Sequence, residues 1–547
     1  MSMKNILNHI TKTPQSEPLP TMVANSAGGF SFAVDPWHRL DRFLILGVDG
    51  GSFYASERAL TKENAAVVAG CVSQDGPRVV ARIVAVSEAG RAPRNDPAIF
   101  ALAVALKTGD LETRRLAGAA VVRVCRTATM LFSLVEAVKA FGGFGRITDR
   151  AIEGWYLDKG TDELALQLAK YQSRNGWSHR DLLRKAKPVP GNDTQKQLFA
   201  WAVGKPADVS CVPLLAGFEQ AKASTSSREV ADLVVKHRLP RECVPTQYLG
   251  DRDVWLALLA IGMPMGALLR NLGKLTAVGA LAPLSSTTAE VCARFRDGRQ
   301  LQQARLHPLA ILVAQRVYAS GHGDKGSLTW QPVPEIVAAL EAAFRLAFDA
   351  VEPANRRFLV GLDVSGSMAG GRVANSPLTP REAAAAMALV LTATEPRSLV
   401  TAFSAAGVGA WSPTVTTKKS SMGTGNGISP LPLQASSTLA QAIAMTSNLP
   451  FGATDCALPM RYALEKHLEV DCFVVLTDNE TWAGDVHPVK ALAAYRKQTG
   501  IAARLVVVGM VSNGFTIADK DDAGMLDVVG FDTATPSLIS AFARGDV

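Results

Sequence analysis

The residue pattern of this chain changes near Pro353, and that change limits the possible folds more than any other feature. Before it, apolar residues recur at helical spacing in segments separated by Gly and Pro. After it, short β-branched runs alternate with alanine-rich or amphipathic stretches, as in a parallel sheet covered by helices. The 547 residues are too many for one core. We therefore expect a helical domain over 1–352 and an α/β domain over 353–547.

The first part is predicted to hold short helices in series. One begins at Asp96-Pro97, because Pro is favoured at the first helical position, and ends at Gly109. Other helices are expected within 111–142 with a break at 127–129, and over 162–171, 178–187, 227–238, 252–272, 309–320 and 334–348. Such a series indicates helical hairpins stacked as a solenoid, although no fixed sequence period is visible.

The second part is predicted to hold four strands, in the strings RRFLVGLD, SLVTAFS, DCFVVLTD and ARLVVVG. Between Ala405 and Pro432 lies a stretch rich in Gly, Ser and Thr. We expect this stretch to form a mobile surface loop.

Several features bear on the compartment. The longest apolar stretch, 254–269, is interrupted by Pro264 and is shorter than the ~20 residues that span a bilayer. The first twenty residues lack the apolar core of a signal peptide. The seven cysteines are scattered and odd in number, which excludes a full disulfide framework and favours buried free thiols. We expect a cytoplasmic protein without a membrane span.

The excess positive charge is confined to the helical part. Residues 353–547 hold 15 Lys plus Arg and 16 Asp plus Glu, whereas the residues before them hold 42 basic and 33 acidic side chains. This imbalance favours a polyanion such as nucleic acid as the partner of the first part, although many arginine-rich proteins are basic for other reasons.

A candidate cation site lies in the second part. Asp363, Ser365 and Ser367 form a D-x-S-x-S string at the end of an expected strand, where open α/β sheets bind ligands. Thr454 lies in FGATDCALPM, and Asp478 ends another strand. Carboxylate and hydroxyl oxygens suit Mg²⁺. The two serines could instead cap the following helix.

A basic segment in the first part is the candidate nucleic-acid interface. Between 164 and 190 it has six basic residues and one acidic residue, Asp181. A capping box from Ser178 to Asp181 opens one of its helices, and Tyr171 and Trp177 could stack on bases. The alternative is a solvated basic helix with Trp177 as a core anchor.

Taken together, these strings resemble the Ro ribonucleoprotein family, whose helical part is the TROVE domain. The similar segments are GGFSFAVDPWHRLDRFLILGVDGGSFY at 28–54, GRAPRNDPAIFALAVALKTGD at 90–110, YQSRNGWSHRDLLR at 171–184, HPLAILVAQRVYASGHGDKGSLTW at 307–330, LDVSGSM at 362–368, GATDCALPM at 452–460, LTDNETW at 476–482 and SNGFTIADKDDAGMLDVVGFDT at 512–533. The loop at 405–432 looks longer than its family counterpart.

The resemblance implies a ring of HEAT-like helical repeats closed by a Rossmann-like von Willebrand factor A domain. It further implies a noncatalytic RNA-binding protein in RNA quality control or processing. Such a protein binds small structured Y-like RNA on its outer surface and the 3′ ends of misfolded or decaying noncoding RNA in a central hole. A partner such as an exoribonuclease is implied as well, and a monomer is expected because one chain can close such a ring.

Site residues carry over by the same resemblance. The RNA-contact segment maps onto Lys170, Arg174, His179, Arg180 and Arg184. A metal-ion-dependent adhesion site for Mg²⁺ or another divalent cation maps onto Asp363, Ser365, Ser367, Thr454 and Asp478.

Two other functions compete with RNA binding. In the first, the protein is an interaction scaffold whose A domain captures a partner carboxylate through Mg²⁺, with the helices as a spacer. In the second, it is an RNA-processing enzyme, for which the sequence offers no recognisable set of catalytic residues.

Overall fold

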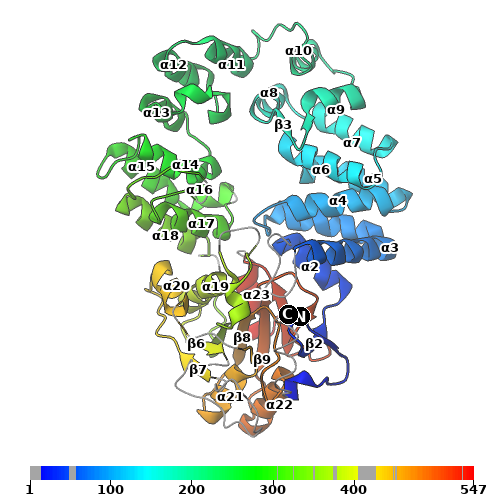
Figure 1. The fold of residues 1–547 in the computed structure, drawn as a ribbon, viewed down its shortest axis with the longest axis vertical. Coiled ribbons are helices and arrows are strands. Elements are labelled where there is room, and N and C mark those ends of the chain that lie inside the picture. Colours follow the sequence, from blue (N-terminus) through cyan, green and yellow to red (C-terminus); the bar gives the residue numbers. More distant parts are fainter. Residues whose placement is uncertain are drawn as a thin grey trace, which may run out of the picture.

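The computed structural model describes residues 14–47, 57–304, 306–323, 326–348, 351–373, 378–404, 427–447, 449, 453–531 and 534–546. In it, an arch of helices stands on an α/β part, and the two together form a ring (Figure 1). One arm of the arch runs from α2 (Pro36–Leu46) up to α9 (His179–Ala186), and the other runs from α13 (Arg252–Ala260) down to α18 (Pro334–Leu346), with α10 to α12 (193–237) across the top. The expected fold class, a helical ring closed by an α/β domain, is confirmed.

Helices in series make up the arch, as the sequence predicts, and all are short except α3, which is interrupted by non-helical backbone at Asp75. They are α2 Pro36–Leu46, α3 Glu57–Ala89, α4 Asp96–Thr108, α5 Leu111–Val124, α6 Ala128–Ala140, α7 Arg146–Leu157, α8 Thr161–Lys170, α9 His179–Ala186, α10 Asp193–Ala202, α11 Pro213–Ala223, α12 Ser227–His237, α13 Arg252–Ala260, α14 Met265–Ala277, α15 Ser286–Phe295, α16 Gly298–Gln303, α17 Pro308–Ala319 and α18 Pro334–Leu346.

Helix ends follow the local sequence. The break expected at 127–129 is present, because the side chain of Thr127 accepts a hydrogen bond from the backbone of Met130 and caps α6. The single helix expected over 252–272 is wrong. The chain turns at Gly262, whose φ of 79° favours glycine, and α14 begins after Pro264.

The α/β part is built on a six-stranded sheet of order β11-β9-β8-β5-β6-β7. Its strands are β5 Phe358–Asp363, β6 Ser398–Ser404, β7 Gly427–Pro430, β8 Cys472–Thr477, β9 Arg504–Gly509 and β11 Met525–Val529. All neighbours are parallel except β7, which runs antiparallel to β6. The loop expected over 405–432 is wrong at its end, because residues 427–430 form strand β7. The rest of that loop, 405–426, lies outside the described residues.

Helices cover both faces of this sheet. Val360, Val474 and Val506 point into the core that the sheet shares with α19 Pro380–Thr394 and the arch. Leu359 and Phe473 point into a separate core with α21 Leu458–Glu465 and α22 Pro488–Thr499. This alternation follows the period of two along a strand. The remaining helices are α20 Leu439–Ser447 and α23 Ala534–Arg544.

The N-terminal residues pack on the α/β part, although the sequence places them in the first domain. A 3₁₀ turn, Pro14–Ser16, is followed by β1 Met22–Ala24 and β2 Phe30–Ala33. β2 pairs antiparallel with β10 Phe515–Thr516 near the other end of the chain. A division at residue 352 thus assigns to the helical domain a segment that pairs with strands of the second part.

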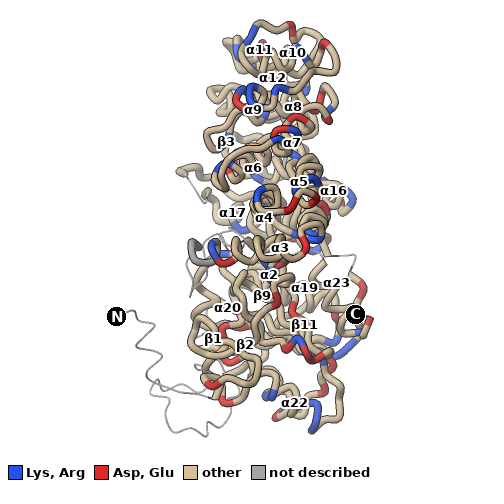
Figure 2. The backbone as a smooth tube through the Cα atoms, turned by 90° about the vertical axis from the view of Figure 1, so that its right-hand side faces the viewer, with Lys and Arg blue, Asp and Glu red and all other residues tan. Residues whose placement is uncertain are grey.

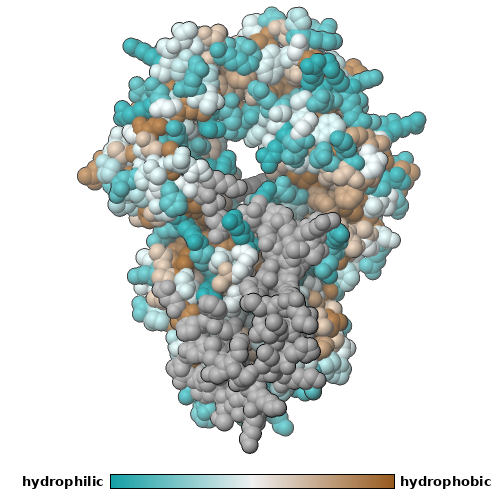
Figure 3. Space-filling model, viewed as in Figure 1, coloured by the Kyte–Doolittle hydropathy of each residue, from teal (hydrophilic) through white to brown (hydrophobic). Residues whose placement is uncertain are grey.

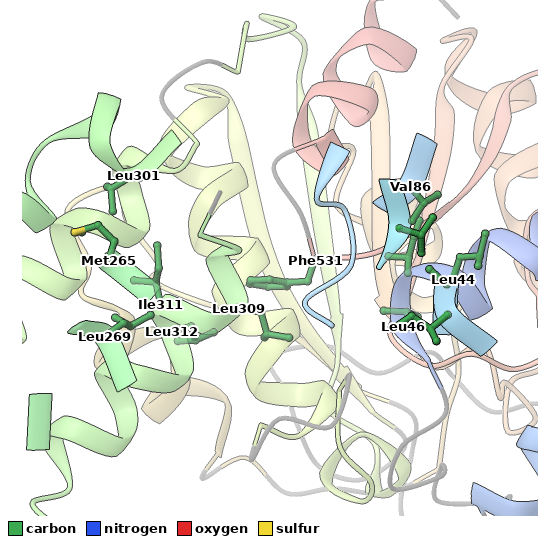
Figure 4. Close-up of a cluster of buried hydrophobic side chains, with 14 of the residues drawn as sticks. Leu44, Leu46, Val86, Met265, Leu269, Leu301, Leu309, Ile311, Leu312 and Phe531 are labelled. Atoms are coloured by element: carbon green, nitrogen blue, oxygen red, sulfur yellow. The ribbon is translucent and has the colours of Figure 1, made fainter. Parts of the chain in front are cut away.

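The α/β part holds both arms of the arch. Arg42 of α2 donates to Asp527 of β11 (2.5 and 2.6 Å), and Arg316 of α17 pairs with Glu382 of α19 (2.5 Å). Phe531 lies between Leu309 of one arm and Leu44 and Val86 of the other (Figure 4), and all belong to one buried cluster. These contacts close the ring at its base.

Within the described residues, no helix combines the length and the apolar character needed to cross a membrane.

Candidate nucleic-acid interface and ion site

Two cavities lie between the arms of the arch, because each is lined by residues from both. The larger, of about 740 Å³, is lined by Arg94 before α4 and by residues of α14 and α17. The other, of about 510 Å³, is lined by Arg126 and Arg174 of one arm and by Arg270 and Ala310 of the other. The space-filling view shows an opening through the molecule between the arms (Figure 3).

Positive charge dominates these two cavities. Their basic lining residues are Arg94, Arg126, Arg174, Arg241, Arg270 and Lys274. Among the described residues that line them, the one acidic side chain is Asp96, which pairs with Arg94 at 2.7 Å. An anionic strand that enters the hole would therefore meet cations on both sides.

Three of these cations face no local acidic partner. Arg174, Arg270 and Lys274 form no ion pair with any residue in the part of the chain that the structure describes. Arg241 also lines the larger cavity, and its Nε is buried without a hydrogen-bond partner among the described atoms. Guanidinium and ammonium groups without an acidic partner are suited to bind phosphate.

The basic segment is shaped by a hairpin and a capped helix. α8 ends at Lys170, and a two-residue turn at Asn175 and Gly176, with φ of 52° and 77°, joins β3 Ser173–Arg174 to β4 Trp177–Ser178. Both φ values are positive, as in the tight turns of hairpins. The predicted capping box of α9 is present, since Ser178 and Asp181 exchange hydrogen bonds. The hairpin, which the sequence did not predict, places Arg174 at the hole.

His179 is a correction to the expected RNA contacts. Its side chain is only 3% exposed, and its ring nitrogens lie 2.7 Å from the hydroxyl of Tyr156 and 3.2 Å from the backbone oxygen of Gln167. Burial lowers the pKa of His179 to about 4, so the ring is neutral at pH 7. A neutral, buried ring with both nitrogens in use supports the packing of α7, α8 and α9 and offers RNA no charge.

The other predicted contacts separate into different places. Lys170 lies near Glu242 (3.8 Å) and over the ring of Tyr171. Arg180 and Arg184 lie one turn apart on α9, in the upper half of the arch (Figure 2). Arg180 lines a third cavity, of about 660 Å³, with Trp201 and Lys222. Trp177 is half-buried and donates to Glu136 (2.7 Å), which agrees with the alternative of a packed anchor.

Sequence reasoning missed most cations of the hole. Arg94, Arg241, Arg270 and Lys274 are far apart in the sequence, and only the fold brings them together. The sequence held one indication of this site. The strings GRAPRNDP and HPLAIL, which resemble the family, contain Arg94 and Ala310, and these two residues line the same cavity.

The candidate ion site is a buried network of oxygen ligands at the carboxyl ends of β5 and β8. One carboxylate oxygen of Asp363 accepts from the Thr477 hydroxyl (2.7 Å) and the other from the backbone of Ser365 (2.9 Å). The hydroxyls of Ser365 and Ser367 lie 3.1 Å apart. Ser367 in turn hydrogen-bonds Asp478, so four of the five predicted ligands adjoin.

Thr454 is the fifth predicted ligand. Its backbone oxygen accepts from Trp482 (3.1 Å) and Ala483 (3.0 Å), which holds Thr454 against the loop after β8 that carries Asp478. Its hydroxyl is buried and has no hydrogen-bond partner in the described structure. A buried hydroxyl without a partner is costly, and a bound cation would satisfy it.

The electrostatics of the site favour a cation. Burial, followed by the charges of Asp363 and Glu480, raises the pKa of Asp478 well above its usual range. Burial also raises the pKa of Asp363. The charge of Arg381, which donates to the backbone oxygens of Val364 and Ser365, opposes this rise at Asp363. Two converging carboxylates still resist ionisation unless a further positive charge joins them. No cluster of three or more His, Cys, Asp or Glu ligands occurs in the described residues, so hydroxyls would have to supply the other ligands.

Comparison with known proteins gives matches along the whole chain. The model of the Ro60 vWA domain matches residues 357–543, and the model of the TROVE domain matches residues 23–231 and 232–356. The chain is similar to the RNA-binding protein RO60 of Deinococcus radiodurans, with 41% identity over all of both chains. It is also similar to the RNA-binding protein RO60 of Caenorhabditis elegans, with 34% identity over 96% of this chain and 90% of that protein.

A solved structure shows the same similarity. The crystal structure of the Ro (RSR) protein of Deinococcus radiodurans matches with a TM-score of 0.69 and 40% identity, over 94% of this chain and all of that one.

Proposed function

The chain belongs to the Ro60 family of TROVE and von Willebrand A domain proteins, and on that premise we propose that it is a noncatalytic RNA-binding protein that holds single-stranded RNA ends in its central hole. The relatives in Deinococcus radiodurans and Caenorhabditis elegans are named RNA-binding proteins. The observation that carries the proposal is the set of six cations from both arms that line the two cavities of the hole.

The position of these cations supports single-stranded RNA as the proposed ligand. They lie between two arms, so a strand must enter the gap to reach both sides, and a thin, flexible strand can do so more readily than a duplex. Binding through phosphates is independent of sequence and falls steeply with salt. We therefore propose that the 3′ ends of misfolded or decaying noncoding RNA are the ligands of the hole.

A second RNA surface is proposed on the upper half of the arch. Arg180 and Arg184 are exposed one turn apart on α9, and neither forms an ion pair with a described residue. Two cations at this spacing suit successive phosphates of a folded RNA. A small structured Y-like RNA bound here would occupy the arch while the hole stays available. In this proposal the chain serves cytoplasmic RNA quality control, and an exoribonuclease is its candidate partner.

The A domain supports an alternative function, as a scaffold that captures a partner carboxylate. Asp363, Ser365, Ser367, Thr454 and Asp478 would hold Mg²⁺ or another divalent cation. The ion, when bound, would supply a positive charge and open coordination positions for a partner's oxygen. The buried Thr454 hydroxyl and the two converging carboxylates favour this ion site. It is compatible with RNA binding by the arch.

The proposal is tested by crosslinking in cells and sequencing of the bound RNA. Three forms are compared: the wild type, a hole variant with Arg174→Ala, Arg270→Ala and Lys274→Ala, and an α9 variant with Arg180→Ala and Arg184→Ala. We expect RNAs with single-stranded 3′ ends to be lost from the hole variant and retained by the α9 variant. An equal RNA profile in all three, or no enriched RNA with the wild type, would refute the proposal.

An Asp363→Ala variant separates the alternative function from the main one. If RNA binding is the function, its RNA profile stays that of the wild type. If the protein is only a scaffold, this variant loses its protein partner and the wild type enriches no RNA.

A further inference from the structure

The larger cavity of the hole has apolar and aromatic walls, which a site that binds phosphates alone does not need. We propose that it takes an unstacked nucleobase from the single-stranded RNA, with the neighbouring phosphates on the cations of its rim. This inference rests on the proposed function and adds a base-binding pocket to it. Its volume of about 740 Å³ lies within the range of small-molecule sites, ~300–1,000 Å³.

The walls of the cavity are apolar and aromatic. They are formed by Leu269, Ala310, Val313, Val317, Leu328 and Trp330. Both Leu328, which is 38% exposed, and Trp330, which is half-buried, line the cavity. Unpaired bases bind to such surfaces because every base has an apolar π-face. Phosphates have no apolar face and gain nothing from these walls.

The Trp330 ring is held in place before any ligand arrives. Its Nε1 donates to the backbone oxygen of Tyr318 (2.9 Å), and the rings of Trp330 and Tyr318 stack with centroids 6.0 Å apart and planes 21° apart. Gly273 of α14 lies directly against the ring, since a Cβ there would lie 2.6 Å from it. A fixed aromatic ring loses little entropy when a base stacks on it.

Charge on the rim identifies the occupant as a nucleotide. Arg94, Arg241, Arg270 and Lys274 line the same cavity as the apolar residues, and no acidic side chain lines it among the described residues. An apolar peptide would gain from the walls but leave Arg241, Arg270 and Lys274, which form no ion pair with a described residue, without a counter-charge. A nucleotide satisfies both, because its base is apolar on its faces and its phosphate is anionic. The wall and the rim together therefore match one ligand.

The test fills the cavity without touching its charges. Ala314, on α17, lines the cavity, and Ala314→Trp would occupy it. Ala289→Trp on α15 is the matched control, because Ala289 is exposed and does not line the cavity. Binding of two labelled oligomers is measured for each protein: oligouridylate, and an abasic ribose-phosphate chain of the same length.

If the pocket holds a base, Ala314→Trp binds oligouridylate about tenfold more weakly than the wild type and the control do. The abasic chain then binds all three proteins alike, because it uses the rim alone. Equal binding of oligouridylate by the wild type and Ala314→Trp would overturn the pocket and leave RNA binding in place. If the wild type binds neither oligomer, the proposed function itself is wrong.

Crosslinking of the wild type tests the pocket without a variant, in case Ala314→Trp does not fold. Oligouridylate carrying 4-thiouridine is irradiated on the protein, and the crosslinked peptides are mapped by mass spectrometry. We expect crosslinks at residues 326–330 and 310–317. Crosslinks confined to other segments would overturn the pocket.

Discussion

The Nε2 of His307 lies 3.1 Å from the backbone oxygen of Arg91, although 216 residues separate them in the sequence. His307 caps α17, since its Nδ1 accepts a hydrogen bond from the backbone of Leu309 (3.1 Å). A neutral ring that accepts at Nδ1 carries its proton on Nε2, so Nε2 donates to Arg91. One side chain thus both starts a helix of one arm and joins it to the other.

Two variants of His307 separate these roles. His307→Asn should keep a helix cap but not reach Arg91, whereas His307→Ala should lose both. Hydrogen–deuterium exchange should then be faster in residues 88–94 of both variants, and faster at the start of α17 only in His307→Ala. Unchanged exchange in residues 88–94 would show that this bond does not hold the arms together.

His179 should contribute to stability and to its pH dependence. The folded-state pKa of about 4 lies below the ordinary 6.5, so the unfolded chain binds the proton more tightly and stability falls as pH drops from about 6.5 towards 4. From pH 7 to 5 the loss from this group is about 2 kcal/mol. Urea unfolding of the wild type and His179→Gln should show a smaller loss in the variant. An equal loss of stability in the wild type and the variant would mean that folding does not lower the pKa of the His179 ring.

Arg42 should be essential for docking α2 on the sheet. Its side chain is fully buried, and that of Asp527 is 12% exposed. Arg42→Met leaves the carboxylate of Asp527 without its ion-pair partner, although the Thr516 hydroxyl still donates to it, and should lower the free energy of unfolding by about 3 to 5 kcal/mol. The double variant Arg42→Met, Asp527→Leu should recover much of this loss in thermal unfolding. Equal melting temperatures of the single variant and the wild type would contradict this role.

The ion site predicts a response to Mg²⁺. Mg²⁺ should raise the melting temperature of the wild type, because a ligand of the folded state stabilises it. Asp478→Asn removes one of two converging carboxylates, so without Mg²⁺ it should be at least as stable as the wild type, and it should not respond to the ion. Asp253→Asn on α13, an exposed position, serves as the control. A Mg²⁺ response that survives in Asp478→Asn would place the ion elsewhere.

The sequence predicted those features that depend on neighbouring residues. The break before α6, the capping box of Ser178 and Asp181, and strands β5, β6, β8 and β9 follow from local patterns, and all are present. The helix expected over 252–272 failed at Pro264, where the apolar pattern continues through the turn. Apolar periodicity alone does not predict where such a helix is interrupted.

Features that depend on closure of the helical ring could not be predicted from neighbouring residues. The exposure of His179 is set by Tyr156 and by the backbone of Gln167, so a basic-looking segment hides a neutral core residue. The cations of the hole are joined by closure of the ring, which no local pattern encodes. Asp363 and Asp478 were easier to find, because Asp363 ends β5, Asp478 directly follows β8, and neighbouring parallel strands bring their carboxyl ends together.

The most direct test of the account is the salt dependence with which the purified protein binds an RNA hairpin that has a single-stranded 3′ tail. Arg174→Ala, Arg270→Ala and Lys274→Ala together should weaken binding and lower the slope of log K against log salt by about 2, since each lost phosphate contact on a single strand removes ~0.7. The α9 variant should bind the tail like the wild type. The same affinity and slope for the hole variant as for the wild type would contradict the claim that RNA ends bind in the hole.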